Sequence, residues 1–128
     1  MILILGAAHA GKHDAARQLY HISEFCDGQT AAFSEILQAR AVSHFHCLVR
    51  RLMAEGESPQ DFTRRFLREN PDAVVLTNEI GCGIVPIERE ERLWREECGI
   101  CTRHLAAHAD SVIRVVCGIS TAIKGELP

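Results

Sequence analysis

The stretch MILILGAAHAGKH, residues 1–13, decides the fold that this sequence predicts. Met1–Leu5 is a continuous apolar run that ends at a glycine, which is typical of a strand buried on both faces of a parallel sheet. The next residues have the spacing G-x-x-x-x-G-K, and a helix is predicted from Gly11 to about Ser23. A buried strand, a glycine loop and a helix in this order predict a phosphate-binding loop.

The predicted phosphate loop supplies the candidate nucleotide-binding residues Gly6, Ala7, Ala8, His9, Ala10, Gly11, Lys12 and His13. Its glycines allow successive backbone N–H groups to point into one concavity, and the positive N-terminal end of the following helix also attracts an anion. Lys12, one of only two lysines, is expected to reach the β and γ phosphates. An ordinary strand-to-helix turn is the alternative.

His13 departs from the usual form of such a loop. The residue after the lysine is normally a serine or threonine whose hydroxyl ligates Mg²⁺. Neutral imidazole is a poor ligand for this oxygen-preferring ion, so His13 weakens the case for metal-assisted phosphoryl transfer. Direct contact between a protonated His13 and phosphate is the alternative, and His9 offers the same chemistry.

The composition describes one ordinary globular domain spanning residues 1–128. Hydrophobic residues make up 47% and charged residues 24% of the chain. A net charge of −3 argues against a nucleic-acid-binding domain and against a polybasic membrane anchor. No basic segment precedes the first apolar run, and no run is long enough to span a bilayer, so a cytoplasmic protein with reduced thiols is expected.

Strands alternate with helices along the rest of the chain, which predicts an α/β fold: a small parallel sheet with flanking helices in three layers. Ligands bind such sheets at the carboxyl ends of the strands. The loops expected there are Gly6–His13, Asn78–Pro86 and Gly118–Lys124. The other predicted elements are a turn at Phe25–Thr30, helices at Ala32–Ala54, Pro59–Glu69 (capped by Ser58) and 87–109, and buried strands at Ala73–Thr77 and Ser111–Cys117.

A second loop, TNEIGCGIVP at residues 77–86, follows the second predicted strand. A carboxylate just beyond a strand and next to a phosphate loop is placed to act as a general base or to hold a Mg²⁺-bound water. Glu79 has this position, with Asn78 before it. Gly81 and Gly83 would permit a tight return beneath a nucleotide. A solvated glutamate at a strand end is the alternative for Glu79.

Three stretches resemble the bifunctional adenosylcobinamide kinase/adenosylcobinamide-phosphate guanylyltransferase family: VVLTNEIGCGIVP (74–86), RLWREECG (92–99) and HLAAHADSVIRVVCGI (104–119). The family has an N-E-[VI]-G-x-G-x-V-P motif, and its G-G-x-x-S-G-K-S loop is similar to residues 6–13. The resemblance covers about residues 71–119 and 1–13 and is weak between them.

The resemblance implies a P-loop NTPase-like (RecA-like) fold that binds ATP or GTP with Mg²⁺. The family phosphorylates the aminopropanol hydroxyl of adenosylcobinamide and then transfers GMP from GTP to that phosphate through a guanylylated histidine. Gly6, Gly11 and Lys12 carry over as phosphate-loop residues, and Glu79, with Asn78, carries over as the strand-end acid. Lys12 and Glu79 are therefore the expected catalytic residues, and a cobinamide-type corrinoid is the expected partner.

The family's nucleophilic histidine lies in an H-R-x-x-R-P-x-x-W stretch that this sequence lacks. His44 and His46 do not match its order, and their spacing on the predicted helix points them to different faces. A chain of 128 residues is expected to have no room for the missing segment. Kinase chemistry without guanylyl transfer is therefore the first hypothesis. A catalytically degenerate nucleotide- or corrinoid-binding regulatory protein is the second, and a plain α/β interaction domain is the third.

Three weaker features complete the sequence predictions. Asp27 is either a turn residue, which we favour, or a cleft acid, since the family has an acidic residue near its middle strand. Lys124 follows the last predicted strand and is either a phosphate or base contact or part of an exposed tail. Cys98 and Cys101 lie inside a predicted helix and are interpreted as packed thiols, so no metal site is expected. A sheet of three strands has open edges, which predicts a homo-oligomer.

Overall fold

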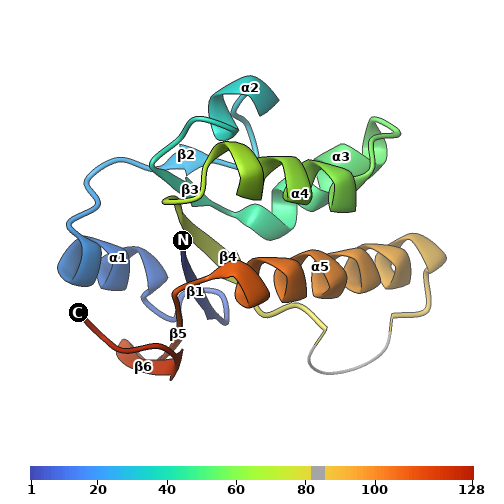
Figure 1. Cartoon of the computed structure of the whole chain (residues 1–128). Helices are drawn as coiled ribbons and strands as arrows, with labels where there is room; N and C mark the ends of the chain where they lie inside the picture. Colours follow the sequence, from blue (N-terminus) through green and yellow to red (C-terminus); the bar gives the residue numbers. More distant parts are fainter. Residues whose placement is uncertain (82–85) are drawn as a thin grey trace.

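The computed structural model describes residues 1–81 and 86–128 (Figure 1). Its strands form one sheet in the order β2-β3-β4-β1-β5-β6, and every neighbouring pair is parallel except the antiparallel pair β5 and β6. The predicted α/β class with a mostly parallel sheet is therefore confirmed. The elements are β1 (Ile2–Gly6), α1 (Lys12–Tyr20), β2 (Cys26–Asp27), α2 (Phe33–Ile36), β3 (Ala41–Ser43), α3 (Phe45–Ala54), α4 (Pro59–Glu69), β4 (Val74–Asn78), α5 (Arg89–His108), β5 (Ser111–Val116) and β6 (Ile119–Lys124).

Two hydrophobic cores lie on opposite faces of the sheet, because successive side chains of a strand point to opposite faces. Leu3 belongs to the core that α3, α4 and α5 cover, and Ile4 belongs to the core that α1 covers. Figure 1 shows α1 on one side of the sheet and α5 on the other. Both side chains are fully buried, and each contributes about 1.5–3 kcal/mol. The predicted three layers are present, one of them formed by α1 alone.

The single helix predicted over Ala32–Ala54 is wrong. This segment contains α2, β3 and α3. Its apolar residues are buried as expected, but Ala41 and Val42 are buried in a strand that pairs with β4. His44 then adopts a left-handed backbone conformation, with φ 53°, and α3 begins after it. A short apolar run fits a buried strand and a helix equally well, and pairing with β4 decides for the strand.

The chain also forms strands at both edges of the sheet where loops were predicted. Cys26–Asp27 pairs with β3, and the predicted turn follows, since the N–H groups of Thr30 and Ala31 donate to the carbonyl of Asp27. Gly118–Lys124 is not a ligand loop but the second half of a β5–β6 hairpin. Cys117, expected in a buried strand, lies exposed between the two strands, with φ 52°.

Lys124 lies far from the phosphate loop, so its predicted place on the ligand side is wrong. It pairs with Val112 at the beginning of β5, whereas the phosphate loop adjoins the end of that strand. Its ammonium donates to the carbonyls of Ala106 and Ala107, at 2.9 and 3.0 Å, in the last turn of α5. Lys124 therefore caps the negative end of that helix.

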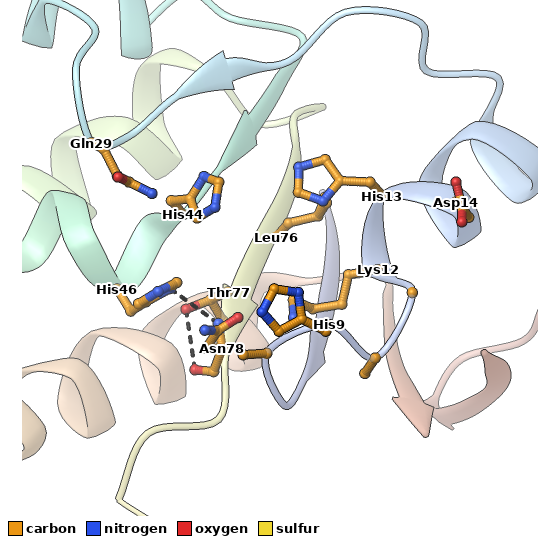
Figure 2. Close-up of a pocket in the computed structure, with 13 residues that line it drawn as sticks. His9, Lys12, His13, Asp14, Gln29, His44, His46, Leu76, Thr77 and Asn78 are labelled. Atoms are coloured by element: carbon orange, nitrogen blue, oxygen red, sulfur yellow. Dashed lines mark hydrogen bonds between the residues drawn. The ribbon is translucent and has the colours of Figure 1, made fainter. Parts of the chain in front are cut away.

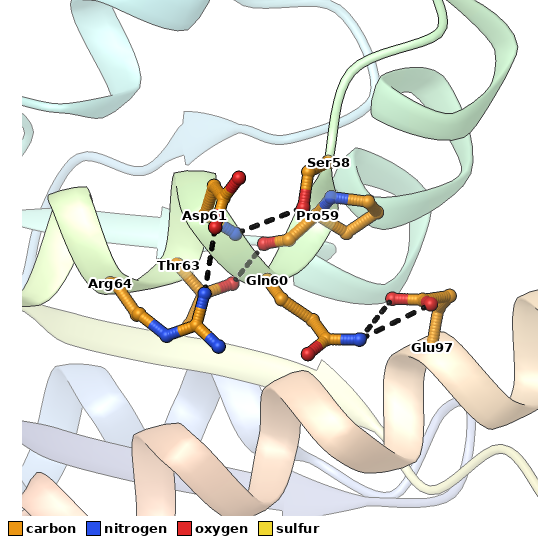
Figure 3. A network of polar contacts seen from close by, with 7 residues as sticks. All are labelled: Ser58, Pro59, Gln60, Asp61, Thr63, Arg64 and Glu97. Carbon is orange, nitrogen blue, oxygen red and sulfur yellow. Dashed lines mark hydrogen bonds and ion pairs between the residues drawn. The ribbon is translucent and has the colours of Figure 1, made fainter.

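Helix α4 packs beside α5 and begins as the sequence predicts (Figure 3). Ser58 is its N-cap, and its hydroxyl accepts a hydrogen bond from the N–H of Asp61 at 3.2 Å, with Pro59 in the first helical position. Between the two helices, the amide of Gln60 donates to both carboxylate oxygens of Glu97 at 3.3 Å.

Replacing Ser58 with alanine is expected to lower the free energy of unfolding by about 1 kcal/mol, because one backbone donor of the first turn loses its acceptor. Denaturant titration followed by circular dichroism measures this change. Ser34→Ala, at an exposed position of α2, is the matched control and should change stability by less than about 0.5 kcal/mol. Equal effects of the two substitutions would contradict the capping role.

The sheet has six strands rather than the three that the sequence predicts, and its edge strands are β2 and β6. On β6 the side chains of Ile119 and Ile123 are 70% and 60% exposed. An apolar edge strand offers unpaired backbone groups to another chain, so self-association remains a prediction. Within the described part of the chain, no helix is both long and apolar enough to cross a membrane.

Candidate functional site

The phosphate loop joins β1 to α1 and is braced from behind by β5 and the β5–β6 turn. A Cβ on Gly6 would lie 2.5 Å from the carbonyl oxygen of Val115, so only glycine allows β5 to approach this closely. Gly11 has φ 101° and packs against Gly118. The N–H of Gly118 donates to the carbonyl of Ala10 at 2.9 Å. The hairpin turn thus supports the loop, a contact that the sequence did not reveal.

Lys12 is the first residue of α1, and its ammonium lies across the loop. Its Nζ donates to the carbonyl oxygens of Ala7 and Gly6, at 2.7 and 3.3 Å, and the residue is only 7% exposed. Burial lowers the pKa of Lys12, and the negative charge of Glu79 opposes this shift. A buried ammonium that is bound only to neutral carbonyls is an unbalanced positive charge, which favours an anionic ligand.

A cavity of about 530 Å³ opens over the loop (Figure 2). This volume is within the range of small-molecule sites. Its walls come from the carboxyl ends of β1, β2, β3 and β4, which is where parallel sheets bind ligands. The lining residues are Ala8, His9, Ala10, Gly11, Lys12, His13, Asp14, Gln29, His44, His46, Leu76, Thr77 and Asn78. Of the predicted nucleotide-binding residues, Gly6 and Ala7 lie beneath this lining and hold Lys12 through their carbonyls.

Four histidines line this cavity, and two of them, His44 just before α3 and His46 in its first turn, face the phosphate loop. The ring of His13 lies 5.8 Å from that of His44, and the ring of His44 lies 5.9 Å from that of His46, centre to centre. Figure 2 shows His44 and His46 across the cavity from His9 and His13. The prediction that His44 and His46 point to different faces is wrong, because His44 precedes the helix and both rings line one cavity.

Asp27 lies behind this group of rings. Its carboxylate accepts a hydrogen bond from the N–H of Gln29 at 2.8 Å, which is the turn role that the sequence favoured. The same oxygen lies 3.2 Å from Nδ1 of His44. His44 lines the cavity and Asp27 does not, so Asp27 contacts the cavity wall from outside the lining.

His46 is a fixed part of the cavity wall. Its Nδ1 accepts a hydrogen bond from the N–H of Asn78 at 3.1 Å, and its carbonyl accepts one from Nε1 of Trp94 at 2.8 Å. Burial, with the charges of His44 and Lys12, lowers the pKa of His46 to about 4. The ring is therefore neutral near pH 7, and the bond to Asn78 places its proton on Nε2.

Glu79 lies beside the main cavity rather than in its lining. Its carboxylate accepts bonds from Nε and Nη2 of Arg114, at 3.1 and 3.4 Å, and its N–H donates to the carbonyl of Gly6 at 3.0 Å. It lines a second hollow of about 310 Å³ between the end of β4 and α5. Thr77 and Asn78 line both cavities, so the two cavities are neighbours. Of the two glycines predicted to allow a tight return, Gly81 has φ 104°, and Gly83 lies outside the described residues.

The described lining of the main cavity offers Mg²⁺ no unpaired carboxylate. Asp14 is the one carboxylate in its lining, and it forms an ion pair with Arg17 at 2.9 Å. The other side chains there that can bind a metal are four imidazoles, which suit softer ions than magnesium, and the neutral oxygens of Gln29, Thr77 and Asn78. Within residues 1–81 and 86–128 no three side chains of histidine, cysteine, aspartate or glutamate are placed to hold a metal ion. Cys98 and Cys101 are buried free thiols whose pKa is raised by burial, as expected of packed side chains.

Comparison with known proteins finds relatives for most of this chain. Over 100 residues, 75% of this chain, it is 30% identical to the guanine nucleotide-binding protein alpha-9 subunit of Dictyostelium discoideum. Over 51 residues, 40% of this chain, it is 49% and 47% identical to the bifunctional adenosylcobalamin biosynthesis protein CobU of Salmonella typhimurium and of Escherichia coli. Each match spans only 28% of the relative's own length.

The family model described as cobinamide kinase / cobinamide phosphate guanyltransferase matches residues 27–123. That range includes β3, α3, β4 and α5, which supply part of the wall of the main cavity and most of the second hollow, and nearly all of the hairpin that braces the loop. The predicted phosphate loop, residues 6–13, lies before the matched range. The chain therefore belongs to the cobinamide kinase / cobinamide phosphate guanyltransferase family.

Proposed function

We propose that this chain binds the phosphate chain of ATP or GTP in the main cavity and transfers the terminal phosphoryl group to an alcohol of a cobinamide-type corrinoid in cobalamin biosynthesis. The buried ammonium of Lys12, held across the loop by the carbonyls of Gly6 and Ala7, is the observation that carries this proposal. Family membership supports the substrate class, and the similarity to a guanine nucleotide-binding protein supports a nucleotide as the ligand.

The two neighbouring cavities suggest how the substrates meet. The triphosphate would lie on the loop, where backbone N–H groups and the N-terminal end of α1 attract anions. The alcohol would approach from the second hollow, past Thr77 and Asn78. Its oxygen would attack the terminal phosphorus, the bond to the bridging oxygen would break, and the nucleoside diphosphate would leave. The carboxylate of Glu79, which lines the second hollow, would accept the hydroxyl proton.

Nucleotide binding without transfer is the second candidate function. Arg114 holds the carboxylate of Glu79, which lies outside the main cavity lining, and the one carboxylate among the described residues of that lining, Asp14, is paired with Arg17. These two observations favour a regulatory protein that retains the phosphate loop. Guanylyl transfer is not part of the proposal, because the H-R-x-x-R-P-x-x-W stretch is missing.

Glu79→Gln separates the two functions. If Glu79 is the general base, this substitution should lower the rate of labelled phosphate transfer to adenosylcobinamide by about a hundredfold or more. The dissociation constant for the nucleotide should change by less than about threefold, because Glu79 lies outside the main cavity lining.

Glu69→Gln is the matched control, since Glu69 pairs with Arg65 on the exposed side of α4 and should affect neither quantity. Nucleotide binding without any phosphate transfer by the unmodified protein would reject the kinase and leave the binding protein. Transfer at an unchanged rate in Glu79→Gln would reject the role of this carboxylate.

A further inference from the structure

The phosphate loop has a histidine where a magnesium-binding hydroxyl is usual, and other histidines gather opposite it. His13 follows Lys12 at the beginning of α1, and its ring packs edge-on against Phe25 at 4.7 Å and lies 5.8 Å from His44. Both imidazoles line the cavity that opens over the loop. Once protonated, each imidazole can donate hydrogen bonds to an anion.

We propose that His13, with His44 opposite it, binds the phosphate oxygens of the nucleotide directly, so that the cavity selects the metal-free form of the triphosphate. This inference rests on the proposed nucleotide binding and specifies the form of the ligand. Three observations support it: the position of His13 in the loop, the distance between the two rings, and a lining whose one carboxylate is already paired.

The charges around His13 keep its ring neutral while the cavity holds no ligand. Burial lowers the pKa of His13, and the positive charges of His44, Arg17 and Lys12 lower it further, while Asp14 opposes them. The other titratable groups nearby are His9 and His46 in the cavity lining and Asp27, which lies 3.2 Å from His44. Asp27 is not among the lining residues, so its negative charge acts on His44 and does not directly face a bound anion.

A bound triphosphate reverses this balance. It brings about four negative charges close to His13, and an opposite charge nearby raises the pKa of an imidazole. The pKa of His13 is then higher in the complex than in the free protein, so binding takes up a proton from solution. Affinity is greatest at low pH and falls as the pH rises through the pKa of the complex, by at most about tenfold per pH unit for each proton.

Magnesium should oppose this mode of binding. A Mg²⁺ ion on the triphosphate neutralises part of its charge and occupies oxygens that the imidazoles would otherwise contact. The ion would also stand close to the positive charges of Lys12 and protonated His13 and repel both. Magnesium and the imidazoles therefore compete for the same phosphate oxygens. The metal-free nucleotide is the form that binds more tightly.

Calorimetric titration of ATP and of GTP into the unmodified protein at pH 7 tests the inference. Two buffers with different ionisation enthalpies give the number of protons taken up, and each titration is run with a chelator and again with excess Mg²⁺. We expect uptake of about half to one proton per nucleotide and at least about threefold weaker apparent binding with Mg²⁺. Binding that Mg²⁺ strengthens, or that takes up no proton, would overturn the inference and leave the proposed nucleotide binding intact.

Two substitutions at one position make the result specific. His13→Asn should abolish most of the proton uptake, and His13→Ser should restore the usual hydroxyl so that Mg²⁺ then strengthens binding. His21→Asn is the matched control: His21 ends α1 with φ 56°, a conformation that asparagine tolerates, and it lies outside the cavity lining. Equal proton uptake in all these proteins would also overturn the role of His13, while the absence of nucleotide binding under every condition would overturn both this inference and the proposed function.

Discussion

Lys12→Ala is expected to weaken the binding of ATP and GTP by about a hundredfold. Truncating one member of a charged, hydrogen-bonded contact costs about 2–5 kcal/mol, and each 1.4 kcal/mol is a factor of about ten in the dissociation constant. Lys12 is 7% exposed, sits against the loop carbonyls, and is the one lysine or arginine among the described residues that line the cavity. Calorimetric titration of the nucleotide measures the loss.

The second lysine supplies the control for this experiment. Lys124→Ala removes the same side chain from the far end of the β5–β6 hairpin, where it binds the last carbonyls of α5. It should leave the dissociation constant unchanged within about twofold, and at most slightly lower the melting temperature. A Lys12→Ala protein that melts normally and binds nucleotide as well as the Lys124→Ala protein would contradict the proposed phosphate loop.

Gly6→Ala is expected to lower the free energy of unfolding by about 2–3 kcal/mol and to abolish nucleotide binding. The added Cβ would lie 2.5 Å from the carbonyl oxygen of Val115, a backbone atom of the neighbouring strand that cannot rotate away. Either β1 or β5 must move, and both support the phosphate loop. Denaturant titration gives the stability, and nucleotide titration of the folded fraction gives the binding.

Gly99→Ala is the matched control for Gly6→Ala. Gly99 lies inside α5, and a Cβ there would meet no atom within 4 Å. Since alanine is the better helix former, this substitution should stabilise the protein by about 0.5–1 kcal/mol. If Gly6→Ala were as stable as Gly99→Ala, the close approach of β1 and β5 behind the loop would be wrong.

The first part of the fold could be predicted because every local signal agrees there. The apolar run, the glycines and the amphipathic segment after them all indicate β1, the loop and α1, and the structure has them within a few residues. The prediction for the segment around Val42 is wrong because a three-residue strand has too short a pattern to be told from a helix. Its pairing partner also lies more than 30 residues away. The two-residue strand β2 also has too short a pattern, whereas β6 has six residues and is fixed by its hairpin with β5.

Half of the candidate site could be found in the same way. The loop residues follow from spacing, whereas His44, His46 and Gln29 reach the cavity only because the sheet places β2, β3 and β4 on one side of β1. One usable signal was present: His44 directly follows an apolar pair and a serine, the pattern of a strand that ends at the ligand side of a parallel sheet. The pairing of Glu79 with Arg114 depends on neighbouring β5 and had no local signal.

The central claim is that the loop over Gly6–His13 binds the phosphate chain of a nucleotide. Titrating ATP, GTP and inorganic triphosphate into the unmodified protein, and following the heat of binding, tests it most directly. The account predicts saturable binding of both nucleotides at about one site per chain, with inorganic triphosphate competing for that site because the loop contacts the phosphates. No saturable binding of either nucleotide at millimolar concentration, or nucleotide binding with which inorganic triphosphate does not compete, would contradict it.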